Sequence, residues 1–398
     1  MRTYYPYAEE KHGGFPIGNS HPPSSRLPSG AAESERHRVA VMKQQKYLAI
    51  PPGAIVPWSM PKFKIYVLSV TGQYVLWTVE GNGVSPEQLD RLSESGQSEV
   101  FIDLEEQFKY EEYLEVHLDN ILANEGPSDD QKAAIFSRVS TNVVKHAFES
   151  SFGFKPIGTD ILQRTQAMIE KALIFIAESR SLQALAKIVG HDYETYEHAT
   201  KVLWFTVGFL GNNPDVLQRI RPDSEAMEES HRLEVLRQCG VGALLHDIGK
   251  TLVAQEILHK NGPLTEIEWE IMKRHPFNGL AMILDTDLPG FVKKGVLHHH
   301  EDFCGGGYPM GLEGEDIPVL PRVLRIVDTF DAMTSRRPYK DPIPPFKAAQ
   351  IMVGKAESTK AGADLGQDVR DQGMRQCFDE ELLRKFIVFL GHMKLANF

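Results

Sequence analysis

The sequence predicts an α+β protein, in which a small α/β module precedes a larger all-helical bundle around a metal centre. Strand-like segments are confined to residues 47–103, helical periodicity dominates beyond about residue 110, and six of the 15 histidines fall between His246 and His300. The 398 residues exceed one typical core of about 100–200 residues. We therefore expect a disordered tail at 1–45, a regulatory α/β module with a helical linker at 46–125, and a helical catalytic domain at 126–398.

The predicted module begins after a tail rich in glycine, proline, serine and charge, which has no apolar period. The segments Phe63–Val70 and Tyr74–Val79 are rich in β-branched and aromatic residues and stand three residues apart, which predicts a hairpin. Ser85, directly before a proline, predicts a helix start, and Val100–Ile102 predicts another strand. Because these residues contain no His/Cys cluster and no glycine-rich phosphate loop, we expect a regulatory or assembly role.

The remainder of the chain shows apolar residues at a helical period, with Ser128 as the expected cap of one helix. No strand-like alternation interrupts this region. The predicted helices are Ile161–Ala177, Tyr193–Leu210, Leu233–Leu245, Glu266–Leu284, Leu320–Met333 and Phe378–Leu395.

Composition excludes several classes of protein. The net charge of −11 argues against binding to a nucleic-acid polymer, which needs a basic surface, but not against a small phosphorylated ligand. The three cysteines are widely separated and form no disulfide framework, which favours a reducing compartment. No apolar run approaches the ~20 residues of a membrane span, and the N-terminus lacks a secretory signal. We expect a cytoplasmic protein.

Histidine and carboxylate residues recur in five short segments of the helical region. Imidazole and carboxylate together suit iron, manganese or zinc better than magnesium or calcium. Asp247 follows His246 directly, and its two oxygens could bridge two metals, an arrangement that activates water and binds phosphate oxygens. Lys250, one turn later, adds a cation for phosphate. The pattern favours a metal-dependent phosphohydrolase. The candidates in the five segments are Glu194, His198, His246, Asp247, His275, His298, His299, His300, Glu301, Asp328 and, one turn after it, Asp331.

From Tyr193 to about Leu390 the chain resembles the HD-GYP domain, a subgroup of the HD phosphohydrolase superfamily. The resemblance rests on spaced motifs rather than on one match. They are HDIGK at His246–Lys250, HHE at His299–Glu301, GGGYPMGLEGEDIP at Gly305–Pro318 and RVLRIVDTFDAMTSRRPY at Arg322–Tyr339.

The resemblance implies a helical bundle that hydrolyses the second messenger cyclic di-GMP to pGpG, and often on to GMP. It implies two or three divalent metals, most readily iron or manganese, with Asp247 as the bridge and Glu194 as a ligand where three are bound. The implied ligands are His198, His246, Asp247, His275, His299, His300 and Asp328. Asp247 and Lys250 are the implied catalytic residues, and Lys250, Tyr308, Pro309, Arg337 and Lys340 the implied substrate-binding residues.

Cys304 departs from the motif, because an acidic or amide residue usually stands there. The departure keeps two alternatives open beside the phosphodiesterase: a cyclic di-GMP sensor with slow or no turnover, and an HD phosphohydrolase for another cyclic dinucleotide. The family also suggests a homodimer and diguanylate cyclases or other signalling proteins as partners. No heptad pattern in residues 110–180 supports the dimer.

Overall fold

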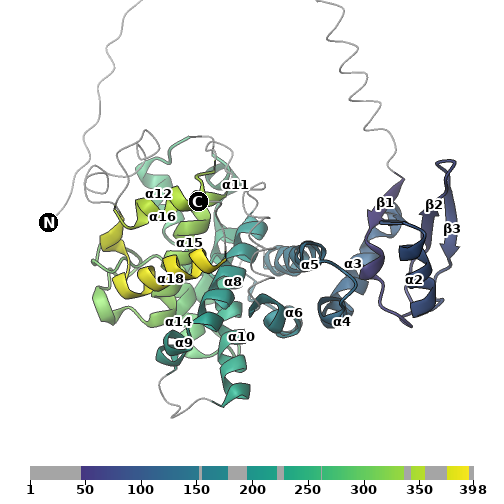
Figure 1. Cartoon of the computed structure of the whole chain (residues 1–398). Helices are drawn as coiled ribbons and strands as arrows, with labels where there is room; N and C mark the ends of the chain where they lie inside the picture. The colour runs from purple at the N-terminus through teal and green to yellow at the C-terminus, as the bar shows by residue number, and fades with distance from the viewer. Residues whose placement is uncertain are drawn as a thin grey trace, which may run out of the picture. The chain divides into compact units, whose positions relative to one another are not determined.

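The computed structural model describes residues 46–151, 155–177, 195–221, 228–260, 262–335, 342–354 and 374–393 (Figure 1). The predicted tail at 1–45 lies outside these residues. Contacts between residues divide the chain into two units, Met1–Lys46 and Tyr47–Phe398. The strands and helices of the described residues all belong to the second unit. The predicted boundary between a regulatory and a catalytic part near residue 125 stays a prediction.

The strands form one antiparallel sheet in the order β1-β4-β2-β3. The hairpin predicted from the β-branched segments is confirmed, since β2 pairs with β3 around a turn in which Gly72 has φ 76°. That backbone conformation is open to glycine at little cost. Ile65 on β2 and Ile102 on β4 pair with each other across the sheet, and both are fully buried. The strands are β1 (Tyr47–Ile50), β2 (Ile65–Leu68), β3 (Tyr74–Thr78) and β4 (Val100–Asp103), with α2 (Pro86–Glu94) between β3 and β4.

Helices make up most of the described chain beyond β4. The predicted cap at Ser128 is confirmed, because its hydroxyl accepts the Gln131 N–H while the Gln131 side chain accepts the Ser128 N–H. Within the described residues, no helix combines the length and the apolar character needed to cross a membrane. The helices are α3 (Gln107–Val116), α4 (Leu118–Ala123), α5 (Asp129–Ser150), α6 (Thr159–Ala177), α8 (Thr195–Asn212), α9 (Pro214–Ile220), α10 (Glu229–Leu245), α11 (Gln255–Leu258), α12 (Glu266–Met272), α13 (His275–Ile283), α14 (Gly290–His298), α15 (Val319–Thr334), α16 (Pro345–Met352) and α18 (Glu380–His392).

Two almost completely buried helices, α8 and α15, form the centre of the bundle. They pack against each other, and α8 also packs against α10 (Figure 1). Aromatic rings pack edge to face between these helices. The ring centroids of Phe205 on α8 and Phe330 on α15 lie 5.4 Å apart, and those of Phe330 and Phe386 on α18 lie 5.5 Å apart. Because apolar partners surround both helices, the polar side chains on them must find partners inside the bundle. The predicted α+β fold class is confirmed.

The single helix predicted over Glu266–Leu284 is wrong. The structure has two helices there, α12 ending at Met272 and α13 starting at His275. Pro276 stands in the first turn of α13, where its missing N–H costs nothing, whereas inside a continuous helix it would remove a hydrogen bond. The break places His275 at a helix start rather than on a helix face.

Candidate metal centre

The predicted metal ligands come from five segments that are far apart in the sequence and meet inside the bundle. His198 lies on α8 and Asp328 on α15, whereas the others lie at helix ends. His246 and Asp247 directly follow α10, His275 begins α13, and His299 and His300 follow α14. Of the eight predicted ligands, Glu194 alone lies outside the described residues, so the ligand for a third metal stays a prediction.

Asp247 lies between two groups of histidines and belongs to both. Its Oδ2 atom lies 3.5 Å from His198 Nε2 and 3.3 Å from His246 Nε2. Its Oδ1 atom lies 3.2 Å from His275 Nε2 and 3.7 Å from His299 Nε2. The two oxygens of one carboxylate therefore face two different sets of imidazole nitrogens, which is the arrangement expected of a bridging ligand.

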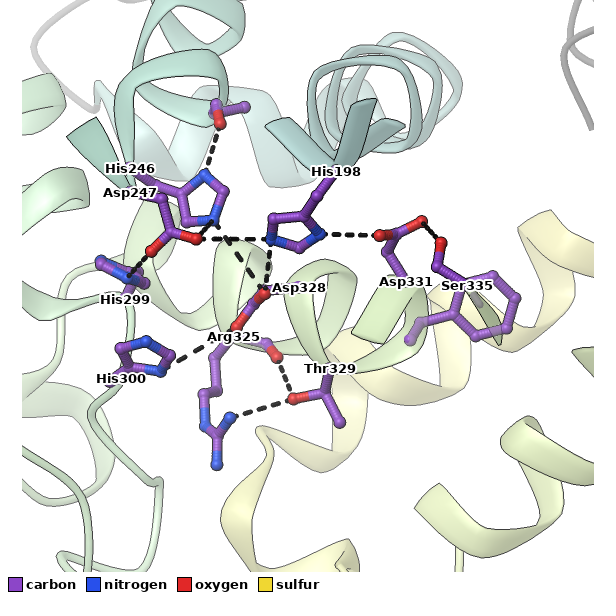
Figure 2. A network of polar contacts seen from close by, with 12 residues as sticks. His198, His246, Asp247, His299, His300, Arg325, Asp328, Thr329, Asp331 and Ser335 are labelled. Carbon is purple, nitrogen blue, oxygen red and sulfur yellow. Dashed lines mark hydrogen bonds and ion pairs between the residues drawn. The ribbon is translucent and has the colours of Figure 1, made fainter. Parts of the chain in front are cut away.

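Two potential metal-binding groups result, each with ligand atoms within 4.8 Å of one another. One contains His198, His246 and Asp247, and the other contains Asp247, His275, His299 and His300. Asp328 adds a second carboxylate, with Oδ1 3.1 Å from His198 Nε2 and Oδ2 3.9 Å from His300 Nδ1 (Figure 2). The structure thus brings together seven of the eight residues predicted from the sequence.

A tight contact between two segments helps to bring His275 to Asp247. Gly249 follows Asp247 closely, and a Cβ atom there would lie 2.0 Å from the His275 carbonyl oxygen and 2.5 Å from the Gly279 nitrogen. Any side chain at Gly249 would therefore push α13 away. The glycine of the HDIGK motif is explained by this packing.

Three histidines are oriented in the same way. The Nδ1 atoms of His246, His275 and His299 each lie 2.7 to 2.8 Å from the carbonyl oxygen three residues earlier, at Ala243, Met272 and Val296. These carbonyls lie at helix ends, where the helix itself supplies no donor. When Nδ1 carries the proton that satisfies them, Nε2 is left with a lone pair for a metal.

His198 is oriented by a carboxylate instead. Its Nδ1 atom lies 2.7 Å from Asp331 Oδ2, and Asp331 Oδ1 accepts a 2.9 Å hydrogen bond from the Ser335 hydroxyl (Figure 2). Lys201 Nζ donates to the same hydroxyl at 3.2 Å. The sequence pattern offers Asp331 only as a candidate one turn after Asp328, and the family resemblance gives it no role. Its spacing on a buried helix was the available signal, but the partner on α8 could not be read from it.

The electrostatics of the centre favour neutral His275, His299 and His300 and an ionised Asp247. Burial lowers the pKa of His275, and lowers that of His299 to about 4. It also lowers the pKa of His300 well below its usual value. Burial by itself would raise the pKa of Asp247, but Lys250 and the neighbouring histidines outweigh it, and the pKa falls well below the usual value. Neutral imidazoles beside ionised carboxylates are the protonation states that bind a metal.

The donor set fits divalent transition metals. Asp247 and His246 are fully buried, and ionised carboxylates at such depth need a compensating cation. By geometry the Nε2 atom of His246 makes no hydrogen bond within the described part of the chain, although it lies 3.3 Å from Asp247 Oδ2. Buried nitrogen and oxygen donors without thiolates suit iron, manganese or zinc.

Three of the predicted catalytic or substrate-binding residues lie beside this centre. Lys250 Nζ donates to Asp247 Oδ2 at 2.5 Å and is partly exposed. Tyr308 stacks on the imidazole of His300, with ring centroids 4.7 Å apart, and is followed by Pro309. Arg337 lies outside the described residues, as does Lys340.

The segment Phe303–Leu312, called the GYP loop below, is tied to the centre through Glu301. The Glu301 carboxylate is buried and accepts N–H bonds from Met310 at 2.7 Å and Leu312 at 3.0 Å. Gly307 passes so close to the chain that a Cβ there would lie 2.1 Å from the Asp302 nitrogen. The glutamate of HHE thus shapes the loop, a role that sequence analysis did not assign.

Residues 217–365 match a family model described as an HD domain. The match covers most of the clustered residues, from His246 to Asp328, and begins after His198. This part of the chain is therefore similar to HD domains. The resemblance stated from the motifs is confirmed by this match and by the curated relatives below.

Two curated relatives illustrate the similarity of the chain to known proteins. It is 29% identical over 299 residues to a cyclic di-GMP phosphodiesterase of Pseudomonas aeruginosa, a match that covers 72% of this chain and 68% of that protein. It is 33% identical over 195 residues to a cyclic di-GMP phosphodiesterase of Thermotoga maritima, covering 46% and 48%. The chain thus spans about two thirds of one relative and about half of the other.

A solved structure of an HDG"Y"P protein from Bdellovibrio bacteriovorus is similar to this chain over most of its length. The TM-score is 0.53 at 17% identity, and the match covers 87% of this chain and 99% of that chain. The two chains share a fold.

Proposed function

We propose that this chain is a metal-dependent phosphodiesterase that hydrolyses cyclic di-GMP to pGpG, GMP or both. The observation that carries the proposal is Asp247, whose two oxygens face two separate sets of buried imidazoles. Such a centre suits two metals beside one phosphodiester. The relatives from Pseudomonas aeruginosa and Thermotoga maritima are named for this reaction, which supports cyclic di-GMP as the substrate.

The proposed cofactors are two or three ions of iron or manganese. His198, His246 and Asp328 would hold one ion, and His275, His299 and His300 a second, with Asp247 shared and Glu194 reserved for a third. When bound, such ions supply Lewis acidity for phosphate oxygens and lower the pKa of water.

The chain's own residues position the substrate. Lys250 presents a cation beside Asp247, and it would meet a phosphate oxygen as the negative charge there grows. Tyr308, held by its stack on His300, would line the pocket with Pro309. Water adds to phosphorus, the bond to the 3′ oxygen breaks, and that oxygen leaves with a proton. Arg337 and Lys340 are proposed further phosphate contacts.

The test is an anaerobic assay of the full chain with cyclic di-GMP, followed by chromatography of the products. The metal-replete protein should form pGpG or GMP, and a chelator should abolish this. Asp247→Ala should also abolish it, whereas Asp287→Asn, which changes an exposed carboxylate, should not. Ligand binding without product in the metal-replete protein would contradict the proposal and favour the sensor.

A second substrate is favoured by one comparison. Over 100 residues the chain is 42% identical to a 3′3′-cGAMP-specific phosphodiesterase of Vibrio cholerae, covering 25% of this chain and 19% of that protein. We therefore propose 3′3′-cGAMP as the alternative substrate. The same assay run with both dinucleotides at equal concentration distinguishes them through the ratio of kcat/KM values.

A further inference from the structure

Two cysteines from distant parts of the sequence meet beside the GYP loop. Cys304 lies in that loop, and Cys377 lies in the segment just before α18. The Phe303 N–H donates to the Cys377 carbonyl oxygen at 2.9 Å. This hydrogen bond brings the backbones beside the two cysteines together, and both thiols are free in the structure.

We propose that Cys304 and Cys377 form a reversible intrachain disulfide that tethers the GYP loop to the segment before α18. The tether is a modification site distinct from the metal ligands. It goes beyond the proposed reaction and does not depend on it.

The two segments are held together by side chains that do not take part in the disulfide. Arg322 Nη1 donates to Asp379 at 2.9 Å, and its guanidinium lies over the Phe303 ring. Arg325 Nε donates to Asp302 at 2.8 Å, and its guanidinium lies 5.9 Å from the centre of the Phe378 ring. A disulfide needs backbones that approach closely. These contacts maintain that approach on both sides of the cysteine pair.

The three cysteines differ in their access to an oxidant. Cys304 is exposed, so it meets the oxidant first. Cys377 is nearly buried, and its pKa is raised to about 12, chiefly by burial and then by the charge of Asp302. Cys239 is fully buried on α10, where burial raises its pKa as well. Cys304 is therefore the reacting thiol and Cys377 the resolving one.

The oxidant is a hydroperoxide. The Cys304 thiolate attacks the peroxide O–O bond, takes up an OH group as a sulfenic acid and releases hydroxide or an alkoxide. The Cys377 sulfur then attacks the Cys304 sulfur, the S–S bond forms, and water leaves with the OH group and the Cys377 proton. A dithiol reverses the reaction by returning two electrons and two protons.

The tether would restrain the loop that carries Tyr308. Hydrogen bonds already hold the end of the loop near Leu312. The Gly314 N–H donates to the Phe303 carbonyl oxygen at 2.8 Å, and Glu301 accepts the N–H groups of Met310 and Leu312. The disulfide would close a covalent ring from Cys304 to Cys377 that includes all of α15. Oxidation should therefore slow amide exchange in the GYP loop.

The experiment treats the reduced full chain with hydrogen peroxide, alkylates the remaining thiols under denaturing conditions and maps the peptides by mass spectrometry. We expect a peptide pair joined through Cys304 and Cys377, the loss of alkylation at both, full alkylation of Cys239, and reversal by a dithiol. Hydrogen exchange on the same samples should show slower exchange in the GYP loop after oxidation.

Two serine variants are the matched controls. Cys377→Ser should leave the Cys304 sulfenic acid unresolved, so that it is trapped by a dimedone-type probe. Cys304→Ser should leave Cys377 reduced. Accumulation of Cys304 sulfenic or sulfinic acid in the unaltered chain, with no joined peptide, would overturn the proposal. So would a disulfide joining Cys304 of two chains. None of these outcomes depends on catalytic activity.

Discussion

Replacing Asp331 with asparagine tests how the centre is organised beyond its ligands. Asp331 is fully buried, lies 2.7 Å from His198 Nδ1 and accepts a hydrogen bond from Ser335. The substitution keeps the shape of the side chain and removes its charge. His198 would remain in place but would lose the partner that fixes its tautomer and raises the basicity of Nε2.

Two independent magnitudes give the expected loss of metal affinity. A hydrogen bond to a charged group contributes about 1.5–3 kcal/mol. Carboxylates behind a ligating histidine typically contribute about 10–100-fold in metal affinity, which is about 1.4–2.7 kcal/mol. Because the two ranges agree, we expect Asp331→Asn to weaken one metal site about 10–100-fold.

The assay is anaerobic competition with a chromophoric chelator, which reports each dissociation constant. Asp379→Asn is the matched control, because Asp379 is also a buried carboxylate but pairs with Arg322 away from the centre. It should lower the free energy of unfolding without changing metal affinity. Unchanged metal affinity in Asp331→Asn would refute the role assigned to Asp331. An equal loss of affinity in both variants would do the same.

Three further predictions concern stability, the loop and catalysis. The pKa of His299 is about 4 when folded and about 6.5 when unfolded, so the unfolded chain binds more protons below about pH 6.5. Urea unfolding of the metal-free protein, measured with a chelator present, should show this group lowering the free energy of unfolding by about 3 kcal/mol as the pH falls to about 4. A free energy of unfolding that does not change with pH over this range would contradict the burial of His299 as a neutral imidazole. Gly307→Ala should cost about 1–3 kcal/mol of unfolding free energy in thermal melts, because its Cβ would collide with the Asp302 backbone; an unchanged melting temperature would show that the loop can yield. Lys250→Met should lower kcat/KM about 10–100-fold with metal content retained, and loss of metal instead would assign Lys250 to holding Asp247.

Local chemistry made much of the fold predictable. The hairpin, the helix starts at Ser85 and Ser128 and the buried helix with Asp328 follow from residue type and periodicity. The break before His275 was equally readable, since Pro276 cannot donate within a helix, but apolar periodicity on both sides hid it. The order of the sheet strands depends on pairing between distant segments, which no local pattern records.

The candidate site, like the fold, could be predicted from the sequence only in part. The residues that carry metal-binding atoms have a recognisable chemistry, and seven of the eight meet in the structure. The groups that orient them do not stand out, because a backbone carbonyl such as that of Ala243 exists at every residue. The role of Asp331 and the approach of the segments that carry Cys304 and Cys377 could be found only by placing distant segments side by side.

In the proposed centre Asp247 joins two metal sites. The most direct test of this arrangement is the metal content of anaerobically purified protein, measured by mass spectrometry for the unaltered chain and for Asp247→Ala. We expect at least two equivalents of iron or manganese in the unaltered chain and at most one in the variant. An Asp247→Ala protein with the full metal content and the full rate of cyclic di-GMP hydrolysis would contradict this arrangement.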